Sequence, residues 1–380
     1  MNTSTESFSK LILAAGVLAC IGLAANAQST QFLPGRLAVL RAGDGQVALH
    51  LKQAPIFIDQ FDPNVFNAAP SFTVAVPTNG PNAFFFNGHA ATEGNLARSA
   101  DHATLTFAGF CGDLLQTSGT PSQLEIPRGI CSVDVTGAKC SIVYRGRGWY
   151  GKTNPRSAVT DGANNFWGAG NVDGVVYYNP STTPEPLAIE SYPNIRNVKI
   201  FNNVLYASLN GADGINMNVA PGVYNSTVDS KPSLPRPKQD ATRMNLVVAS
   251  SIPYTKNVGF DLNPEGTIAY MTDTASGIQK YVKTGGAWKF AYNFAMPRAI
   301  PAEANHGAGC FGLAVDFGGS APIIYATTTE GYGNGVNSNR VVRITDTNAS
   351  AAVVTIAQAG STNVAFRGLD FTPQPAGRRL

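Results

Sequence analysis

The sequence has few charged residues and few histidines. Only 13% of its 380 residues carry charge, four are histidine, and the net charge is +3 at neutral pH. A protein that binds nucleic acid usually shows a strong basic excess or a clustered basic patch. The weak overall charge therefore gives no support for a nucleic-acid partner.

The sequence also lacks the short motifs of several common chemistries. It has no His-Glu-x-x-His and no Cys-x-x-Cys, and its Asp and Asn spacings fit no calcium loop. It has no Gly-x-Ser-x-Gly, and no glycine-rich loop that leads into a helix and would cradle phosphates. We therefore expect no metal ion and no bound cofactor, and the motifs leave open whether the protein is an enzyme.

Long apolar runs are missing except at the N-terminus. A lysine precedes the apolar run 11–25, and Ala25 and Ala27 have the small-x-small spacing of a signal-peptide cleavage site. The run is shorter than the roughly 20 residues of a membrane-spanning helix. We therefore expect a signal peptide at residues 1–27 and no membrane span. The mature protein would be secreted, or periplasmic or at the cell surface in a bacterium; a lipid anchor on Cys20 is the alternative.

Glycine and proline, by contrast, are abundant, at 39 and 24 residues. Turn-forming residues at this density separate many short strands and leave little room for long helices. A short unit also recurs: a strand centred on an aromatic residue, followed closely by a second strand that usually opens with glycine and valine or isoleucine. It occurs at residues 165–177, 204–215, 268–278 and 324–342. Repeated short strands that must stack to bury their faces indicate a β-propeller.

The repeats divide the chain into blades, with one strand left over. Three N-terminal strands, at 36–41, 56–61 and 72–76, lack an inner strand, and a lone strand at 366–371 lacks partners. Pairing the lone strand with the other three completes a sheet and closes the ring without exposed edges. We therefore predict an all-β, six-bladed β-propeller as a single domain over residues 28–380; seven blades is the alternative. The other five blades are expected at residues 94–144, 156–189, 196–250, 257–292 and 311–357.

Several segments resemble those of a group of secreted, largely uncharacterised bacterial repeat proteins. They are the opening, Pro-Gly-x-Leu-x-Val-Leu-Arg-x-Gly-Asp-Gly at residues 34–45, and the segments 91–101, 160–162, 194–203 and 277–281. The resemblance covers most of the mature chain and implies a β-propeller, but it implies no catalytic residues. In architecture alone the predicted fold is similar to the six-bladed gluconolactonase-like and strictosidine synthase-like propellers, and likeness of fold assigns no reaction.

The predicted starts of the inner strands gather positive charge. They carry Glu93, Arg156, Arg196, Lys256, the Cys310-Phe311 pair and Arg367. Like charges around one opening are costly unless an anion, a carboxylate or water compensates them. We therefore predict that this opening binds an anionic ligand, through guanidinium groups that clamp a carboxylate, sulfate or phosphate. Salt bridges and carbonyl contacts between neighbouring blades are the alternative role for these residues.

A loop expected over the same face mixes cations with aromatic residues. Arg147, Trp149 and Tyr150 lie on a glycine-hinged connection, and this combination suits a sugar ring or another flat ligand that carries negative charge. The expected partner is therefore an acidic glycan or a small anionic molecule. Alternatively, these residues only pack over the end of a blade.

His89, Glu93 and His306 are the candidates for proton transfer. Histidine titrates near neutral pH, and a neighbouring carboxylate can tune it. The sequence thus supports a binding protein, or a lyase or hydrolase that acts on an acidic saccharide or ester; a scaffold without a ligand is a third hypothesis. His50 and His102 are expected to be structural.

Four cysteines remain after removal of the signal peptide, and in an oxidising compartment an even number suggests two disulfides. Cys111 and Cys131 lie at one end of a predicted hairpin and form a natural bridge, which leaves Cys140 and Cys310 unpaired. The alternative joins Cys111 to Cys310 and Cys131 to Cys140. We expect a monomer. If the source is eukaryotic, the glycosylation acceptors are Asn225 and Asn348.

Overall fold

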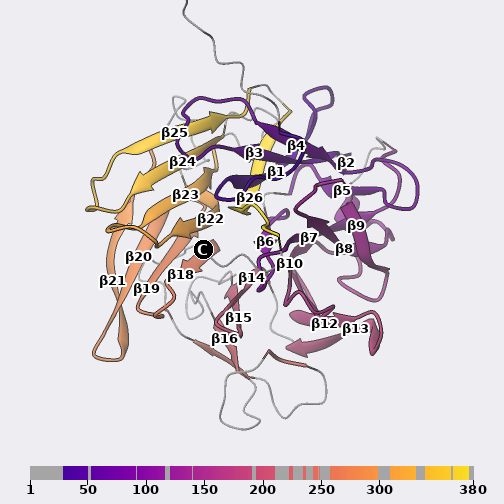
Figure 1. The fold of residues 1–380 in the computed structure, drawn as a ribbon. Coiled ribbons are helices and arrows are strands. Elements are labelled where there is room, and N and C mark those ends of the chain that lie inside the picture. The colour runs from indigo at the N-terminus through magenta and orange to yellow at the C-terminus, as the bar shows by residue number, and fades with distance from the viewer. Residues whose placement is uncertain are drawn as a thin grey trace, which may run out of the picture.

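The computed structural model shows an all-β β-propeller, whose sheets stand side by side around a common centre (Figure 1). It describes residues 29–49, 53–90, 92–115, 120–138, 140–190, 194–209, 222–225, 234–236, 243–246, 248, 257–297, 309–330, 339–360 and 363–375. Within these ranges the one helix is the short 3-10 turn η1 (Pro121–Gln123), and no helix is long and apolar enough to cross a membrane. The predicted signal peptide, His50, Lys256 and His306 lie outside the described residues.

The two ends of the chain share one sheet. Its strands are β26 (Ala365–Phe371), β1 (Leu37–Ala42), β3 (Ile56–Phe61) and β4 (Phe72–Ala75), in that order. β26 pairs antiparallel with β1, and Figure 1 draws the yellow β26 beside the indigo β1. The C-terminal strand therefore completes the N-terminal sheet, as the leftover strand in the sequence predicts.

Four further sheets each contain four consecutive strands in chain order. The first has β10 (Pro155–Thr160), β11 (Phe166–Gly170), β12 (Val175–Asn179) and β13 (Thr183–Glu190). The second has β14 (Ile195–Phe201), β15 (Val204–Leu209), β16 (Gly222–Asn225) and β17 (Arg243–Leu246). The third has β18 (Asn257–Leu262), β19 (Ile268–Asp273), β20 (Gly277–Thr284) and β21 (Ala287–Phe294). The fourth has β22 (Cys310–Asp316), β23 (Ile323–Thr328), β24 (Arg340–Thr345) and β25 (Val353–Gln358).

The remaining sheet departs from the prediction at its inner edge. Its strands are β2 (Gln53–Ala54), β5 (Phe84–Asn87), β6 (Ala97–Arg98), β7 (Thr104–Cys111), β8 (Arg128–Asp134) and β9 (Cys140–Gly146). We expected one inner strand at 94–99, but β6 has two residues and β5 pairs with the opposite end of β7. Gly94 has a φ of +81°, which interrupts an extended strand, so the inner position is divided between β5 and β6. The described residues therefore form five regular four-stranded blades and this irregular sheet.

The inner strands approach one another closely at glycines. A Cβ atom added to Gly368 in β26 would lie 2.4 Å from the backbone nitrogen of Leu96, just before β6. A Cβ atom added to Gly312 in β22 would lie 2.7 Å from the backbone nitrogen of Leu369. Neighbouring inner strands also contact each other around the ring: β22 contacts β18, β18 contacts β14, β14 contacts β10, and β10 contacts β6. A side chain at either glycine would therefore push neighbouring blades apart.

Hydroxyl groups join neighbouring blades beside these contacts. The register of β22 on β23 shifts between Cys310 and Leu313, as in a β-bulge, and there the hydroxyl of Thr327 accepts the N–H of Gly312 at 2.9 Å. The same hydroxyl donates to the carbonyl of Arg367 in β26 at 2.6 Å. The Thr327 side chain thus provides a hydrogen-bond partner for a backbone N–H of its own blade and forms a hydrogen bond to the backbone of the next blade. Other hydroxyl donors and carbonyl acceptors in neighbouring blades are Thr272 with Phe311, Ser208 with Val258, and Thr106 with Ala158.

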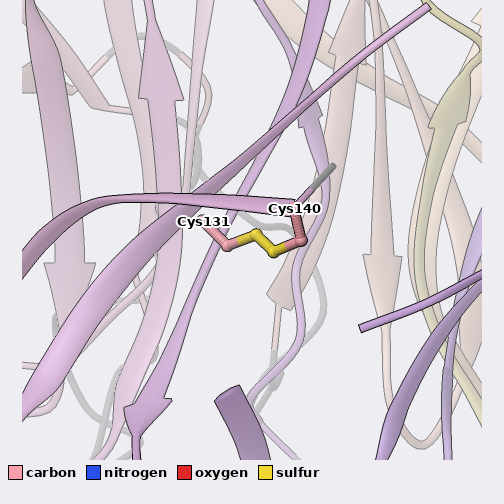
Figure 2. Close-up of a disulfide and its surroundings, with 2 residues drawn as sticks. All are labelled: Cys131 and Cys140. Atoms are coloured by element: carbon pink, nitrogen blue, oxygen red, sulfur yellow. A yellow bond between two sulfur atoms is a disulfide. The ribbon is translucent and has the colours of Figure 1, made fainter. Parts of the chain in front are cut away.

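One disulfide lies between two adjacent strands of the irregular sheet. Cys131 in β8 and Cys140 in β9 are bonded, with their Cα atoms 6.1 Å apart (Figure 2). Cys111 and Cys310 are free thiols buried in two separate apolar clusters. The predicted bridge from Cys111 to Cys131 is therefore wrong, and so is the alternative bridge from Cys111 to Cys310. Of the two predicted arrangements, only the pairing of Cys131 with Cys140 is present among the described residues.

Thr327→Val tests the hydroxyl bridge. Valine keeps the shape of the side chain but leaves the N–H of Gly312 and the carbonyl of Arg367 without their buried partner, so we expect the free energy of unfolding to fall by about 1–3 kcal/mol. Denaturant unfolding measures the change. Thr345→Val, an exposed change of the same kind on β24, should alter stability by about 0.5 kcal/mol or less. Equal effects of the two changes would contradict the bridging role.

Candidate functional site

Three arginines occupy equivalent bulges near the beginnings of inner strands. In β10, Pro155 pairs with Gly170 and Ser157 pairs with Ala169, so Arg156 is an extra, unpaired residue. The register of β14 shifts in the same way between Ile195 and Asn197, around Arg196, and that of β26 shifts around Arg367 and Gly368. A bulge re-aims the side chain of the extra residue. We call this end of the inner strands, defined by Arg156, Arg196 and Arg367, the upper end.

Arg367 is committed to the loop between β5 and β6. Its side chain is almost fully buried, and its Nη2 donates to the carbonyl of Gly88 at 3.0 Å and to that of Asn87 at 3.4 Å. Its Nη1 donates to the carbonyls of Ala90 and Glu93. Because four backbone carbonyls receive its N–H groups, Arg367 holds this loop in place. This contact pattern matches the structural role that the sequence left as an alternative.

Arg156 joins its own blade to the next. Its Nη1 donates to Asn194 Oδ1 at 2.6 Å and to the carbonyl of Ile195 at 3.2 Å, and its Nη2 donates to Asn171 Oδ1 at 3.1 Å. Burial lowers the pKa of Arg156 to about 10, and the nearby carboxyl of Glu93 acts in the opposite direction. At neutral pH Arg156 is therefore a buried cation whose N–H groups are largely used by neutral acceptors.

Arg196 differs from the other two arginines. Its side chain is 8% exposed, and within the described part of the chain its Nε and Nη1 atoms have no hydrogen-bond partner. Burial lowers the pKa of Arg196, and the positive charge of Arg156 lowers it further. A buried guanidinium without acceptors loses its hydration and gains nothing in exchange. Arg196 is therefore the group at the upper end that most needs an external acceptor.

Glu93 is a fully buried carboxyl close to this cluster. Its Oε2 accepts the N–H of Asn87 at 3.0 Å, while its Oε1 has no hydrogen-bond partner among the described residues. Burial raises the pKa of Glu93 to about 8, although the Asn87 N–H, Arg367, Arg156 and Arg128 all lower it. At neutral pH the Glu93 carboxyl is therefore largely protonated and compensates little of the surrounding positive charge.

Asn95 fixes the position of this loop between the inner strands. Its side-chain Nδ2 donates to the carbonyl of Arg196 at 2.9 Å and to that of Arg156 at 3.4 Å. The N–H of Gly368 in β26 donates to the carbonyl of Gly94 at 2.7 Å. The segment from Glu93 to Asn95 thus contacts β10, β14 and β26 at once, and it brings Glu93 near the arginines, as the sequence predicted. The role of Asn95 was not predicted from the sequence, because an asparagine beside glycine usually indicates only a turn.

The predicted aromatic loop is placed differently from our expectation. Trp149 and Tyr150 are fully buried, so they cannot stack on a sugar ring in this structure. The Tyr150 hydroxyl donates to the carbonyl of Gly174 at 2.7 Å, and a Cβ atom added to Gly168 would lie 2.1 Å from the Trp149 ring. Gly168 and Gly170 in β11 leave room for the two rings, so these glycines could have indicated that the aromatic pair is buried. Arg147 on the same loop is exposed.

The other predicted residues give a mixed result. His89 is exposed, and its backbone N–H donates to Asn87 Oδ1 at 3.1 Å. Lys256 and His306 lie outside the described residues, so their placement is untested. Among the described residues, no group of three or more His, Cys, Asp or Glu side chains could hold a metal ion. The candidate site therefore consists of Arg196 with Arg156 and Glu93 close to it.

The sequence predicted no site at the opposite end of the inner strands. There, where these strands end, charged residues line a cavity of about 420 Å³; they include Arg98, Lys199, Asp261 and Asp370. We call it the lower cavity. The charged residues close to the ends of inner strands could have indicated this cavity. They were not used because we expected ligands only at the strand beginnings.

The protonation of Glu93 predicts a dependence of stability on pH. Between the ordinary pKa of 4.5 and the folded value of about 8, Glu93 ionises in the unfolded chain but stays protonated in the folded protein. The folded state then binds more protons, so its stability falls as pH rises through this range. Glu93→Gln mimics the protonated carboxyl, so its stability relative to the natural protein should rise with pH, by up to a few kcal/mol, on the order of 1.4 kcal/mol per pH unit.

Denaturant unfolding across this pH range measures the difference. Glu185→Gln, an exposed change, is the control and should give a constant difference. A constant difference for Glu93→Gln as well would show that Glu93 is ionised in the folded protein.

Comparisons with known proteins show likeness of fold alone. No protein-family model matches the sequence, and no curated protein matches it either. A chain from the crystal structure of a nidogen/laminin complex is 10% identical, with a TM-score of 0.51, and the match covers 88% of this chain and 98% of that one. A putative 6-phosphogluconolactonase from Bacteroides uniformis is 12% identical, with a TM-score of 0.47 and coverage of 86% and 84%. The GH74 xyloglucanase from Xanthomonas campestris is 11% identical, with a TM-score of 0.45 and coverage of 83% and 46%.

Proposed function

We propose that the mature chain, residues 28–380, is a secreted β-propeller that binds an anionic ligand at its upper end. The observation that carries the proposal is Arg196: a buried guanidinium, beside a second buried cation, with two nitrogen atoms that find no acceptor among the described residues. A carboxylate, sulfate or phosphate group would supply those acceptors. The ligand would be an acidic glycan or a small carboxylate or phosphate compound.

The three arginines would contribute in different ways. Arg367 and most of the N–H groups of Arg156 are already bound within the protein, so direct contact with the ligand falls to Arg196. Its guanidinium offers parallel N–H groups, which match the two oxygens of a carboxylate or phosphate. Arg156 adds positive charge at short range and strengthens the attraction in a site with little water.

Other features support the wider proposal. Five regular blades, the irregular sheet of β2 to β9 as a sixth, and the pairing of β26 with β1 support a six-bladed ring acting as one domain. The apolar N-terminal run and the disulfide between Cys131 and Cys140 support export to an oxidising compartment. Arg147 and Lys256 would be further cations around the upper end. The chain would act as a monomer. It would belong to the group of bacterial repeat proteins that its sequence resembles.

Arg196→Gln tests the anion site. We expect the natural protein to show a rise in melting temperature with at least one of galacturonate, glucose 6-sulfate and glucose 6-phosphate, because a ligand that binds only the folded state stabilises it. In Arg196→Gln the affinity for that anion should fall by about tenfold or more. The ligand-free variant should melt at the same temperature or higher, because the change removes a buried cation that has no acceptor.

The control is Lys289→Gln, which removes an exposed positive charge far along the chain from the arginines, on β21. It should leave the anion affinity within about twofold of that of the natural protein. No response to any of the three anions at millimolar concentrations would contradict the proposal. A fall in the stability of ligand-free Arg196→Gln, with anion affinity unchanged, would assign Arg196 a purely structural role instead.

A second candidate function is a lyase or hydrolase that acts on an acidic saccharide or ester. The observation in its favour is the raised pKa of Glu93, since a carboxyl that stays protonated near neutral pH can act as a general acid. The proton acceptor would be His89 or His306. Turnover that Glu93→Gln abolishes while the anion still binds would favour the enzyme; binding without any turnover would favour the binding protein.

A further inference from the structure

The lower cavity lies apart from the upper end of the inner strands. It has a volume of about 420 Å³ and lies where the inner strands β6, β14, β18 and β26 end. This volume falls in the lower part of the range of small-molecule sites, roughly 300–1,000 Å³. The exposed residues Ala100, Asn202 and Asn203 form part of its rim, so it is open to solvent. A ligand about the size of one sugar ring would fit this space.

Lys199 is held rigidly in the wall of the cavity. It is buried, and its Nζ donates to the carbonyl of Leu313 at 3.0 Å and forms a salt bridge with Asp370 Oδ2 at 3.2 Å. An ammonium group carries three N–H bonds. Two of them are used in these contacts, so one remains for a ligand.

Two carboxylates in the wall are fixed by backbone N–H groups. Asp261 accepts the N–H of Val315 at 2.8 Å on one oxygen and that of Leu262 at 2.9 Å on the other. Asp370 accepts the N–H of Arg98 at 3.2 Å and that of Phe371 at 2.8 Å. A carboxylate has about four acceptor positions, so each group keeps acceptors for a ligand. Both are in place before any ligand arrives, which lowers the entropic cost of binding.

The formal charges in the wall cancel. Two cations, Arg98 and Lys199, face two carboxylates, Asp261 and Asp370. Burial raises the pKa of Asp261 to about 6, so it remains mostly ionised at neutral pH. Burial, followed by the charge of Arg98, lowers the pKa of His102, so this ring on the same wall is neutral. A ligand with either net charge would gain one pair of contacts here and meet repulsion from the other pair.

Aromatic side chains provide the apolar part of the wall. They are Phe201, Phe317 and Phe371, and all three are partly buried. The Arg98 guanidinium carbon lies 5.6 Å from the centre of the Phe371 ring, so charge and aromatic surface are close together. Fixed acceptors, fixed donors and apolar rings in one small space suit a ligand that has hydroxyl groups around an apolar ring face.

We propose that the lower cavity binds a neutral polyhydroxylated molecule, a single sugar ring or a cyclitol. Hydroxyl groups of the ligand would donate to Asp261 and Asp370 and accept from Lys199 and Arg98. The apolar face of its ring would lie against the phenylalanine side chains. This site is independent of the anion site proposed for the upper end, because Arg156, Arg196 and Arg367 are not part of its lining.

Titration calorimetry with glucose, galactose, mannose, xylose and myo-inositol tests the proposal on the full mature protein. We expect at least one of these neutral compounds to bind. Ala100→Trp would place an indole over the rim without removing any charged group, and it should weaken that binding by about tenfold or more. Arg98→Gln removes one donor but keeps the backbone bond to Asp370, and it should weaken binding several-fold.

Ala349→Trp, the same change at an exposed position after β24, is the matched control and should leave the affinity unchanged. Arg196→Gln should also leave it unchanged, which separates this site from the upper one. The proposal is overturned if none of the five compounds binds, or if binding is the same in Ala100→Trp as in the natural protein. Glucuronate and glucosamine, which carry charge, are titrated in the same way. The proposal is also overturned if Ala100→Trp weakens the binding of one of these charged sugars and of no neutral compound.

Discussion

The structure depends on hydroxyl groups that bridge from the second strand of one blade to the inner strand of the next. Thr327 and Thr272 show the arrangement most fully, because each accepts an N–H at the bulge of its own blade and donates to a carbonyl beyond it. A bulge leaves backbone groups without strand partners, and buried backbone groups need partners. The bridge meets this need and links the blades in the same contact. Glycines beside it let the backbones approach closely.

The same bulges determine the candidate site. In three inner strands an arginine occupies or adjoins the bulge. The three arginines differ in their supply of acceptors. Arg367 has backbone carbonyls, Arg156 has asparagine side chains and a carbonyl, and two nitrogens of Arg196 have none in the part of the chain that the structure describes. A guanidinium that costs stability when empty is typical of a position kept for binding rather than for folding. Under the proposed function, the same kind of bulge would serve stability at Arg156 and Arg367 and ligand binding at Arg196.

The sequence predicted those parts of the fold that depend on local patterns. The aromatic-centred strands and the lone strand near residue 370 indicated a propeller whose C-terminal strand pairs with β1, because short-range alternation and turn residues carry that information. The placement of Arg156, Arg196 and Arg367 at strand beginnings was also predicted. Their hydrogen-bond partners were not, since these come from loops distant in sequence. Trp149, Tyr150 and Cys111 were misjudged for a similar reason: their burial depends on glycines and apolar side chains of other strands.

The pairing of β26 with β1 has a consequence for the order in which the protein can become functional. β26 follows every other described strand in the chain, yet it supplies Arg367, which holds the loop carrying Glu93, and Asp370, which binds Lys199 in the lower cavity. Neither end of the molecule can reach its final arrangement before β26 has been synthesised and has paired with β1. The loop that carries Glu93 and the wall of the lower cavity therefore become ordered in the same step, when β26 pairs with β1.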